Sequence, residues 1–309
     1  MLKKVVFSID KRWSDDAAFL GQFVRTAEYI ISQGFESEVL SGGDSSFDNY
    51  EEKELQRTLV ACDRAEDAEI LTGKGFYVIG IIHEKNPQEK FKGLKFIFSD
   101  IEEVEMDSFV KAYQRYAGEP WEVIRTDRLI IRETTLDDVD EFYRIYKDPE
   151  MTRYMEGLFE NPEDEKRYQK DYIEKVYGLM GFGVWTLVRA SDNTIIGRAG
   201  YSIRNGFDEI ELGFLIGKEY QKQGYAYEAC RAILDYGRDV LQLDHVQTLV
   251  KKENEVSIHL CKKLGFVETD EVEVEENIYG HGYTGTDRVS LSQAKYGKYL
   301  RLSLDLVTV

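Results

Sequence analysis

Residues Glu211–Ala226, which read ELGFLIGKEYQKQGYA, contain the local pattern on which the fold of the C-terminal half depends. The apolar residues up to Ile216 predict a strand, and the apolar spacing after the short loop that follows predicts a helix. Within the loop, Gln221-x-x-Gly224-x-Ala226 places a glycine where the backbone can come close to a ligand. The start of the helix would present unpaired N–H groups and a positive dipole end, which suit a pyrophosphate. Taken alone, the same spacing is also common in turns that bind nothing.

Other segments strengthen this interpretation. Asn254–Phe266, NEVSIHLCKKLGF, predicts a turn, a short helix and the start of a strand. Further upstream lie Thr126–Glu133 (TDRLIIRE), Asp148-Pro149-Glu150 and Ile196-Gly197. In this order the pieces resemble the GNAT (Gcn5-related) N-acetyltransferase superfamily, and most closely its branch of ribosomal-protein N-terminal acetyltransferases, over roughly residues 121–270. The resemblance implies an α+β domain with a mixed, mostly antiparallel sheet.

The same resemblance implies that acetyl-CoA lies in a V-shaped gap between the strands Glu209–Ile216 and Val246–Val250. The first strand would hydrogen-bond the pantetheine arm, the loop would bind the pyrophosphate, and the Asn254 turn would contact the lower arm. Gln221 stands where the family often has arginine, which removes one charge near the phosphates and leaves the backbone groups. The implied cofactor-binding residues are Phe214, Leu215, Ile216, Gln221, Lys222, Gln223, Gly224, Tyr225, Ala226, Asn254 and Ser257.

Catalysis needs an unprotonated amine, and an alkyl amine with a pKa near 10.4 is neutral only about once in 2500 molecules at pH 7. Glu211 matches a position that often serves as the base in the family; otherwise it is an acidic residue at a strand edge. Glu133 and Glu156 are further candidates. Cys261 occupies the position of a family tyrosine that protonates the departing thiolate. It would be either that proton donor or a small buried core residue.

Composition narrows the function classes. The formal net charge of −18 excludes a typical nucleic-acid binder, because no basic run offsets it. An acidic surface either serves solubility or attracts cationic substrates such as amines. No stretch approaches the ~18 apolar residues of a membrane helix. The three cysteines form neither a disulfide framework nor a zinc pattern, so we expect a cytoplasmic protein without a structural metal.

The N-terminal half alternates strands and helices, from the strand Lys4–Ile9 to the helix Met106–Tyr116. This alternation predicts a parallel, Rossmann-like α/β sheet covered by helices. Gly118-Glu119-Pro120 interrupts the pattern. We therefore expect one domain over residues 1–118 and a second over residues 119–309.

Residues 59–101 resemble the second half of haloacid-dehalogenase-like phosphatases, in which acidic residues after a strand hold magnesium. Asp63 and Asp67 match those acids. The nucleophilic aspartate of that family is replaced by Ser8, and a serine without a base cannot stand in for the carboxylate. We therefore expect a degenerate, non-catalytic module, with a magnesium phosphatase as the alternative.

The sequence thus predicts transfer of an acetyl group from acetyl-CoA to a primary amine of a small molecule or a protein N-terminus, by direct attack in a ternary complex. The alternative is a non-catalytic acetyl-CoA-binding or partner-binding module. Tyr154–Phe159 and the aromatic, acidic helix Pro162–Tyr177 lie where relatives shape the acceptor pocket. The alternating tail Leu300–Val309 predicts a last strand, which would either complete the sheet or pair with another copy in a homodimer.

Overall fold

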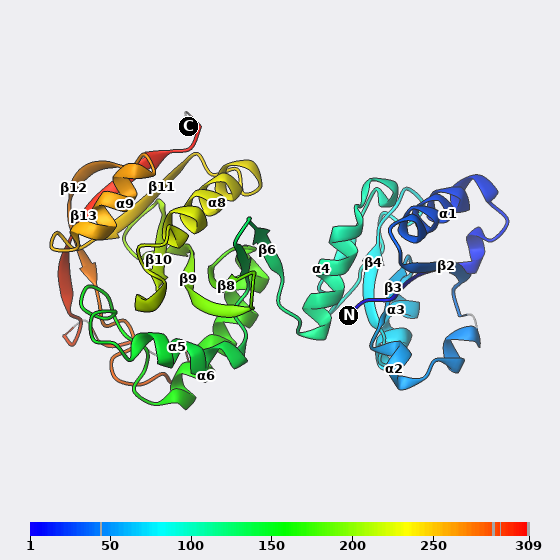
Figure 1. Cartoon of the computed structure of the whole chain (residues 1–309). Coiled ribbons are helices and arrows are strands. Elements are labelled where there is room, and N and C mark those ends of the chain that lie inside the picture. The colour runs from blue at the N-terminus through cyan, green and yellow to red at the C-terminus, as the bar shows by residue number, and fades with distance from the viewer. Residues whose placement is uncertain (44, 286–287, 291, 308–309) are drawn as a thin grey trace. The chain divides into compact units, whose positions relative to one another are not determined.

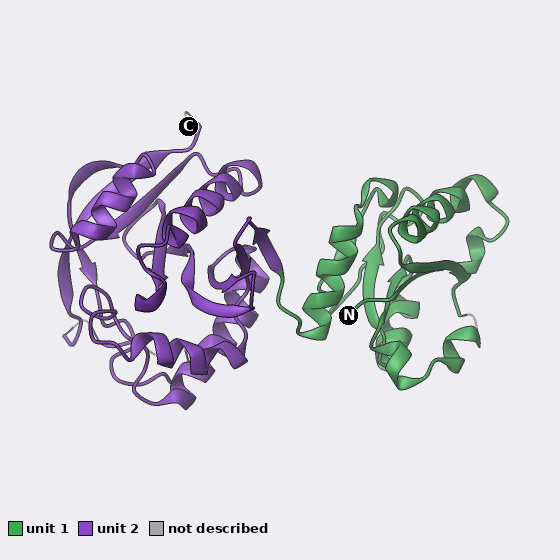
Figure 2. Ribbon diagram, in the orientation of Figure 1, with its two compact units in different colours: residues 1–121 green, residues 122–309 purple. Residues whose placement is uncertain are grey.

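A computed structural model describes residues 1–43, 45–285, 288–290 and 292–307. The chain divides into two compact units, Met1–Trp121 and Glu122–Val309 (Figure 2). The division falls three residues after the expected boundary, because Trp121 still belongs to the first unit: its indole Nε1 donates a hydrogen bond to the carbonyl of Lys111, at 2.9 Å. No helix among the described residues has the length and apolar character needed to cross a membrane.

The first unit is built around a parallel sheet with the strand order β2-β1-β3-β4-β5 (Figure 1). The predicted parallel α/β sheet is therefore confirmed, whereas the haloacid-dehalogenase-like identity stays a prediction. The elements are β1 Lys4–Ile9, α1 Ala17–Ser32, β2 Glu36–Ser41, α2 Glu52–Leu55, β3 Thr58–Cys62, α3 Ala65–Gly73, β4 Tyr77–Ile81, β5 Ile97–Phe98 and α4 Met106–Ala117.

The interior strand β1 is buried on both faces, as expected for a parallel sheet between helices. Phe7 packs with Phe23 of α1 and Phe109 of α4 on one face, where the ring centroids lie 5.9 and 6.2 Å apart. Val6 points to the opposite face and packs in the cluster that includes Leu71 of α3. Two helical layers therefore cover this sheet.

The second unit contains a mixed sheet with the order β12-β13-β11-β10-β9-β8-β7-β6. Every neighbouring pair is antiparallel except β10 and β11, which confirms the mixed, mostly antiparallel sheet. The elements are β6 Glu122–Arg125, β7 Leu129–Arg132, α5 Val139–Tyr146, α6 Pro162–Asp171, a π-helix Tyr172–Tyr177, α7 Gly178–Met180, β8 Val184–Arg189, β9 Thr194–Ile203, β10 Ile210–Ile216, α8 Tyr225–Asp239, β11 His245–Val250, α9 Glu255–Lys263, β12 Val267–Glu275 and β13 Tyr296–Asp305.

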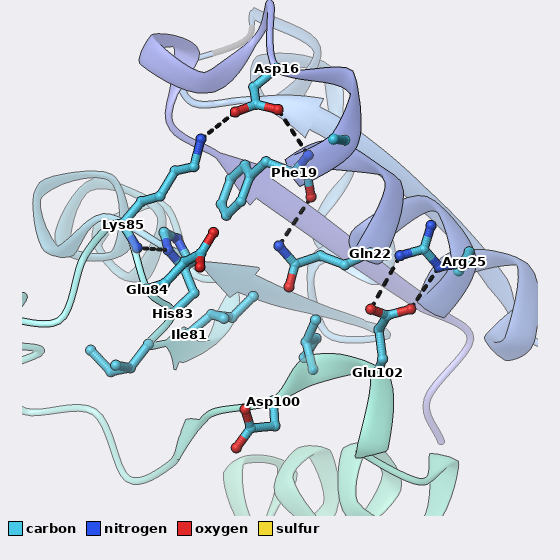
Figure 3. Close-up of a pocket in the computed structure, with 13 residues that line it drawn as sticks. Asp16, Phe19, Gln22, Arg25, Ile81, His83, Glu84, Lys85, Asp100 and Glu102 are labelled. Carbon is cyan, nitrogen blue, oxygen red and sulfur yellow. Dashed lines mark hydrogen bonds and ion pairs between the residues drawn. The ribbon is translucent and has the colours of Figure 1, made fainter.

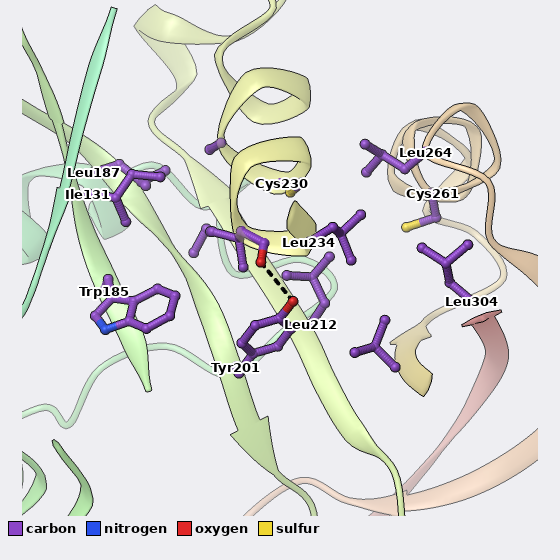
Figure 4. Close-up of a cluster of buried hydrophobic side chains, with 14 of the residues drawn as sticks. Ile131, Trp185, Leu187, Tyr201, Leu212, Cys230, Leu234, Cys261, Leu264 and Leu304 are labelled. Carbon is purple, nitrogen blue, oxygen red and sulfur yellow. Dashed lines mark hydrogen bonds between the residues drawn. The ribbon is translucent and has the colours of Figure 1, made fainter. Parts of the chain in front are cut away.

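Helices α8 and α9 cover one face of this sheet and α5 and α6 cover the other (Figure 1). The core under α8 is apolar, with Trp185 and Leu212 fully buried (Figure 4). The buried Tyr201 satisfies its hydroxyl by donating a hydrogen bond to the carbonyl of Ile233, at 2.9 Å. This bond ties β9 to α8, the helix that follows the Gln221–Ala226 loop.

Some local details differ from the expectations, and one open alternative is decided. The helix predicted over Pro162–Tyr177 is α-helical only to Asp171 and continues as a π-helix. The tail strand β13 inserts between β11 and β12, so it completes the sheet; residues 308–309 of the predicted strand lie outside the described part. Strand β12 starts directly after Phe266, where the sequence predicted a strand, whereas β2 had no clear sequence signal, because it lies at a sheet edge and carries mostly polar or charged residues.

We predict that Gly197→Ala destabilises the second unit. A methyl group on Gly197 of β9 would collide with the backbone carbonyl oxygen of Leu215 in the paired strand β10, and two paired strands have little room to give. Overpacking of this kind costs about 1–3 kcal/mol. Thermal unfolding should show a lower midpoint for this variant. Gly213→Ala is the matched control, because a methyl group there meets no other described heavy atom within 4 Å; an equal loss in both variants would contradict the packing argument.

Candidate acetyl-CoA and acceptor site

The two parallel strands of the second unit separate soon after they meet. β10 pairs with β11 only at Ile210↔Val246 and Glu211↔Gln247. On its other edge β10 pairs with β9 along all seven residues, to Ile216. The backbone edge of β10 beyond Glu211 that faces β11 therefore lacks a strand partner, as the family resemblance led us to expect.

The alternation of backbone groups identifies which residues face this gap. The N–H of Gly217 donates to the carbonyl of Ile196 in β9, at 2.8 Å. Successive residues of a strand direct their backbone groups to opposite edges, so Phe214 and Ile216 direct theirs toward β11. The carbonyl of Ile216 already accepts a hydrogen bond from the Gln221 side chain, at 3.0 Å. Phe214 thus offers both backbone groups to the gap, and Leu215 directs its own toward β9.

The loop before α8 is tightly bent. Lys222 has a φ of 59° and Gly224 a φ of 84°, both in the left-handed region, where a glycine is unstrained. The first bond of the helix runs from the N–H of Glu228 to the carbonyl of Gly224. The N–H groups of Tyr225 and Ala226 precede this bond and have no intrahelical partner. Unpaired N–H groups at a helix N-terminus are groups that favour an anion.

Two residues hold the loop in place. Gln221 donates its backbone N–H to Lys218 and its side chain to Ile216, so its role here is to shape the turn. Arg128, which sequence reasoning did not single out, donates to the carbonyl of Gln223 at 3.0 Å and forms an ion pair with Glu228 of α8 at 2.5 Å. Its position inside the Thr126–Glu133 segment was the available signal.

The second predicted contact region lies at the start of α9. Asn254 caps this helix, because its side-chain oxygen accepts a hydrogen bond from the N–H of Ser257 at 3.2 Å. Both predicted residues therefore lie together in the turn after β11, the strand that forms the other side of the gap.

Glu211 lies where the two strands begin to separate. It is 6% exposed, and its carboxylate accepts hydrogen bonds from Arg204 at 2.9 Å (Nε) and 3.5 Å (Nη2). Its register partner Gln247 is fully buried, and the Gln247 Oε1 atom has no hydrogen-bond partner in the described part of the chain. Sequence reasoning missed both Arg204 and Gln247, because neither belongs to a recognisable motif.

Glu156 joins this group from the loop between α5 and α6. Its side chain reaches solvent, but partial burial raises the pKa of its carboxyl to about 7. Glu276 and Glu275 raise this pKa further, whereas Arg204 and Lys251 lower it. Lys251 forms an ion pair with Glu276 at 2.8 Å, and Glu276 also accepts a hydrogen bond from Tyr299.

The two other predicted catalytic candidates are buried. Glu133 follows β7 and is 4% exposed. Cys261 is fully buried in the core beside Leu264 and Leu304 (Figure 4). Burial raises the pKa of the Cys261 thiol to about 11, although a hydrogen bond with Thr248 acts in the opposite direction. These surroundings match the alternative of a packed core residue; proton donation by Cys261 stays a prediction.

The predicted acceptor segments meet in an aromatic cluster. Phe159 of the α5–α6 loop and Tyr168 of α6 contact Tyr279 and Tyr283 of the segment between β12 and β13, with ring centroids 5.4–6.3 Å apart. Asp171 accepts a hydrogen bond from the Tyr283 hydroxyl at 2.7 Å. Aromatic faces beside carboxylates are surroundings that organic cations favour.

In the first unit, the acids singled out by the sequence lie at the carboxyl end of the sheet. Asp63 accepts hydrogen bonds from the backbone of Asp10 at 2.8 Å and from His83 Nε2 at 3.2 Å. The pKa of Asp67 is raised, mainly by burial and then by the nearby Asp10 and Asp63. No cluster of three or more His, Cys, Asp or Glu side chains in the described residues is arranged to hold a metal ion.

Beside these acids a cavity of about 510 Å³ opens between the start of α1 and the ends of β4 and β5 (Figure 3). Its charged side chains are largely paired with one another: Lys85 with Asp16, and Arg25 with Glu102 at 2.7 Å. The internal pairing leaves few groups to recognise a ligand.

Comparison with known proteins shows which family the second unit resembles. The model of the acetyltransferase (GNAT) domain matches residues 128–267. An uncharacterised N-acetyltransferase of Bacillus subtilis, YnaD, is 30% identical over 147 residues, which cover 46% of this chain and 81% of that protein. The chain belongs to the GNAT acetyltransferase family.

Two other relatives of this GNAT protein match over different lengths of the chain. The uncharacterised N-acetyltransferase p20 of Bacillus licheniformis is 29% identical over 151 residues, which cover 47% of this chain and 82% of the relative. The spermidine N(1)-acetyltransferase of Escherichia coli is 38% identical over 86 residues, covering 28% of this chain and 46% of that enzyme. The matched family model spans β10, the loop, α8 and β11.

The raised pKa of Glu156 predicts a pH-dependent effect on stability. Because the folded-state pKa lies above the ordinary 4.5, the folded protein favours the protonated carboxyl, and this contribution is lost as the pH rises through about 7. Glu156→Gln stays neutral, so its melting temperature relative to the wild type should be higher at pH 8 than at pH 4. Glu160→Gln, in the same loop, is the control. A difference in melting temperature between Glu156→Gln and the wild type that does not change with pH would contradict the raised pKa.

Proposed function

We propose that the GNAT unit transfers an acetyl group from acetyl-CoA to a primary amine, by direct attack of the amine in a ternary complex. The main support is the separation of β10 and β11 immediately after Glu211↔Gln247. This separation leaves backbone hydrogen-bonding groups without a strand partner beside a helix N-terminus, and such groups need a partner when they are buried.

The residues present fit the donor. Backbone groups of Phe214 would bind the amide-containing pantetheine arm, and the free N–H groups of Tyr225 and Ala226 would bind the pyrophosphate. Lys222 and Gln223 complete the loop, and Asn254 and Ser257 lie on the other side of the gap. When bound, acetyl-CoA supplies an acetyl thioester that is activated for attack by an amine.

Local charge favours a cationic acceptor. Glu211, Glu156 and Glu276 gather at the gap, where Arg204 and Lys251 partly offset their negative charge. The name of the Escherichia coli relative, spermidine N(1)-acetyltransferase, makes a polyamine the first acceptor to test. Other small amines and protein N-termini remain within the proposal, because loops around one scaffold set the acceptor in such enzymes.

We propose no catalysis for the first unit. Ser8 is buried where the related phosphatases have their nucleophile, and Asp63 is already engaged with Asp10 and His83. A degenerate haloacid-dehalogenase-like module accounts for these features.

A second candidate function is an acetyl-CoA-binding module without turnover. It is favoured by Gln221, whose side chain is used within the loop, and by Cys261, which is sealed in the core. Such a module would bind acetyl-CoA but release no CoA with spermidine or any other amine of a broad panel. Release of thiol above the no-amine blank would reject it.

We predict that acetyl-CoA stabilises the wild type and that Gly224→Ala weakens its binding. A ligand at 100 times its dissociation constant adds about 2.7 kcal/mol, which a thermal shift detects. A side chain at Gly224 is strained at a φ of 84° and lies against Arg128, so the dissociation constant should rise at least about tenfold.

Gly181→Ala is the matched control, because Gly181 also has a positive φ, of 70°, but lies outside the loop. Its dissociation constant for acetyl-CoA should stay at the wild-type value. No shift of the wild type with millimolar acetyl-CoA would refute the proposed donor site.

A further inference from the structure

A group of charged side chains from separate segments meets where β10 and β11 separate. Arg204 of the β9–β10 turn interacts electrostatically with Glu211, Glu156 and Tyr299. Glu156 in turn responds to the charges of Lys251 and Glu276. These residues come from the α5–α6 loop, the β9–β10 turn, β10, the end of β11 and the β12–β13 region, so only the folded sheet brings them together.

Within this group Glu211 is already occupied. Arg204 Nε donates to one of its carboxylate oxygens at 2.9 Å, and Nη2 lies 3.5 Å from the other. Glu211 is also buried, so a proton taken from an amine would displace an ion pair that the fold holds in place. Glu156 has no such ion pair among the described residues, and it reaches solvent, to which it can return a proton.

Two observations mark this place as one that receives a ligand. The buried Gln247 Oε1, beside Glu211 in the register, has no hydrogen-bond partner in the described residues, and an ammonium or amine N–H would supply one. Gly213 lies on the same face as Glu211, two residues along β10, and a methyl group there would meet no other described heavy atom within 4 Å. Open space and an unused acceptor therefore adjoin the acidic group.

On the basis of the proposed acetyl transfer, we propose that Glu156 accepts the proton of the acceptor amine, and that the Arg204–Glu211 pair positions the amine beside it.

The Glu156 carboxylate takes one proton from the ammonium, which frees the nitrogen lone pair. The nitrogen forms the new C–N bond with the acetyl carbon, and the C–S bond breaks. The departing thiolate takes the second proton that the nitrogen loses on becoming an amide. Glu156 then releases its proton to solvent, so one proton is produced for each acetyl group transferred.

The surroundings of Glu156 suit this task. A base works best when its pKa lies near the working pH, and the carboxyl of Glu156 has a pKa of about 7. At neutral pH about half of it is therefore ready to accept a proton. The charged and titratable groups that act on it are Arg204, Lys251, Glu275, Glu276 and Tyr299.

The test compares kcat/KM against pH for the wild type, Glu156→Gln, Glu211→Gln and Glu160→Gln, with spermidine as the first acceptor. For the wild type, we expect kcat/KM to rise with pH up to an apparent pKa near 7 and then to level off; this rise is the limb of the pH profile. Glu156→Gln should lose this limb and fall about 10²–10⁴-fold at pH 7, and the loss should shrink toward pH 9.5, where more of the amine is already neutral. Glu211→Gln should lower the rate but keep the limb, and Glu160→Gln should match the wild type.

A second measurement does not depend on turnover. Carboxyl ¹³C NMR of the wild type should show one glutamate that titrates near pH 7, and this signal should be absent from Glu156→Gln. The acetyl-CoA dissociation constant should be the same in both proteins.

The outcomes separate the two proposals. A Glu156→Gln enzyme that retains the limb, or a limb that disappears in Glu211→Gln alone, overturns the assignment and favours Glu211 as the base, as the sequence predicted. A wild type that binds acetyl-CoA but releases no CoA with any amine overturns the proposed function and the assignment with it.

Discussion

The interruption of the β10–β11 ladder is the constraint on which the rest of the GNAT unit depends. The two strands share only two register pairs, and each is held along its other edge, β10 by β9 and β11 by β13. These outer ladders allow the two strands to separate without unfolding. The separation leaves peptide groups exposed between them, and the α8 N-terminus adds further free donors at one end of the gap.

In the proposed site, the side chains around the gap would add chemistry to cofactor binding. Arg204 holds Glu211 at the point of separation, and the same guanidinium acts on Glu156 across the site. In the proposed mechanism one carboxylate is thereby fixed, and the other exchanges protons with solvent. Environments that separate the behaviour of two carboxylates in this way are a common means of dividing roles in enzymes.

The first unit also gathers acidic side chains, but there they are held by hydrogen bonds and ion pairs within the fold. Asp63 bonds to the Asp10 backbone and to His83, and the charges of the neighbouring cavity pair with one another. The carboxyl end of a parallel sheet is the usual position of a ligand site, and these acidic residues lie there. Here their hydrogen-bonding capacity is largely used inside the fold.

By itself the sequence determined the features that depend on neighbouring residues: the strand that ends at Ile216, the Gln221–Ala226 loop with its left-handed Gly224, the helix after it, and the Asn254 cap. It missed β2, whose polar edge positions give no apolar period. Only the tertiary structure decided where along their length β10 and β11 separate, that Cys261 is buried in the core, and that Arg204 interacts with both Glu211 and Glu156. Periodicity and capping act within a few residues of chain, whereas strand pairing and charge contacts join segments tens of residues apart, and no local pattern encodes their distance.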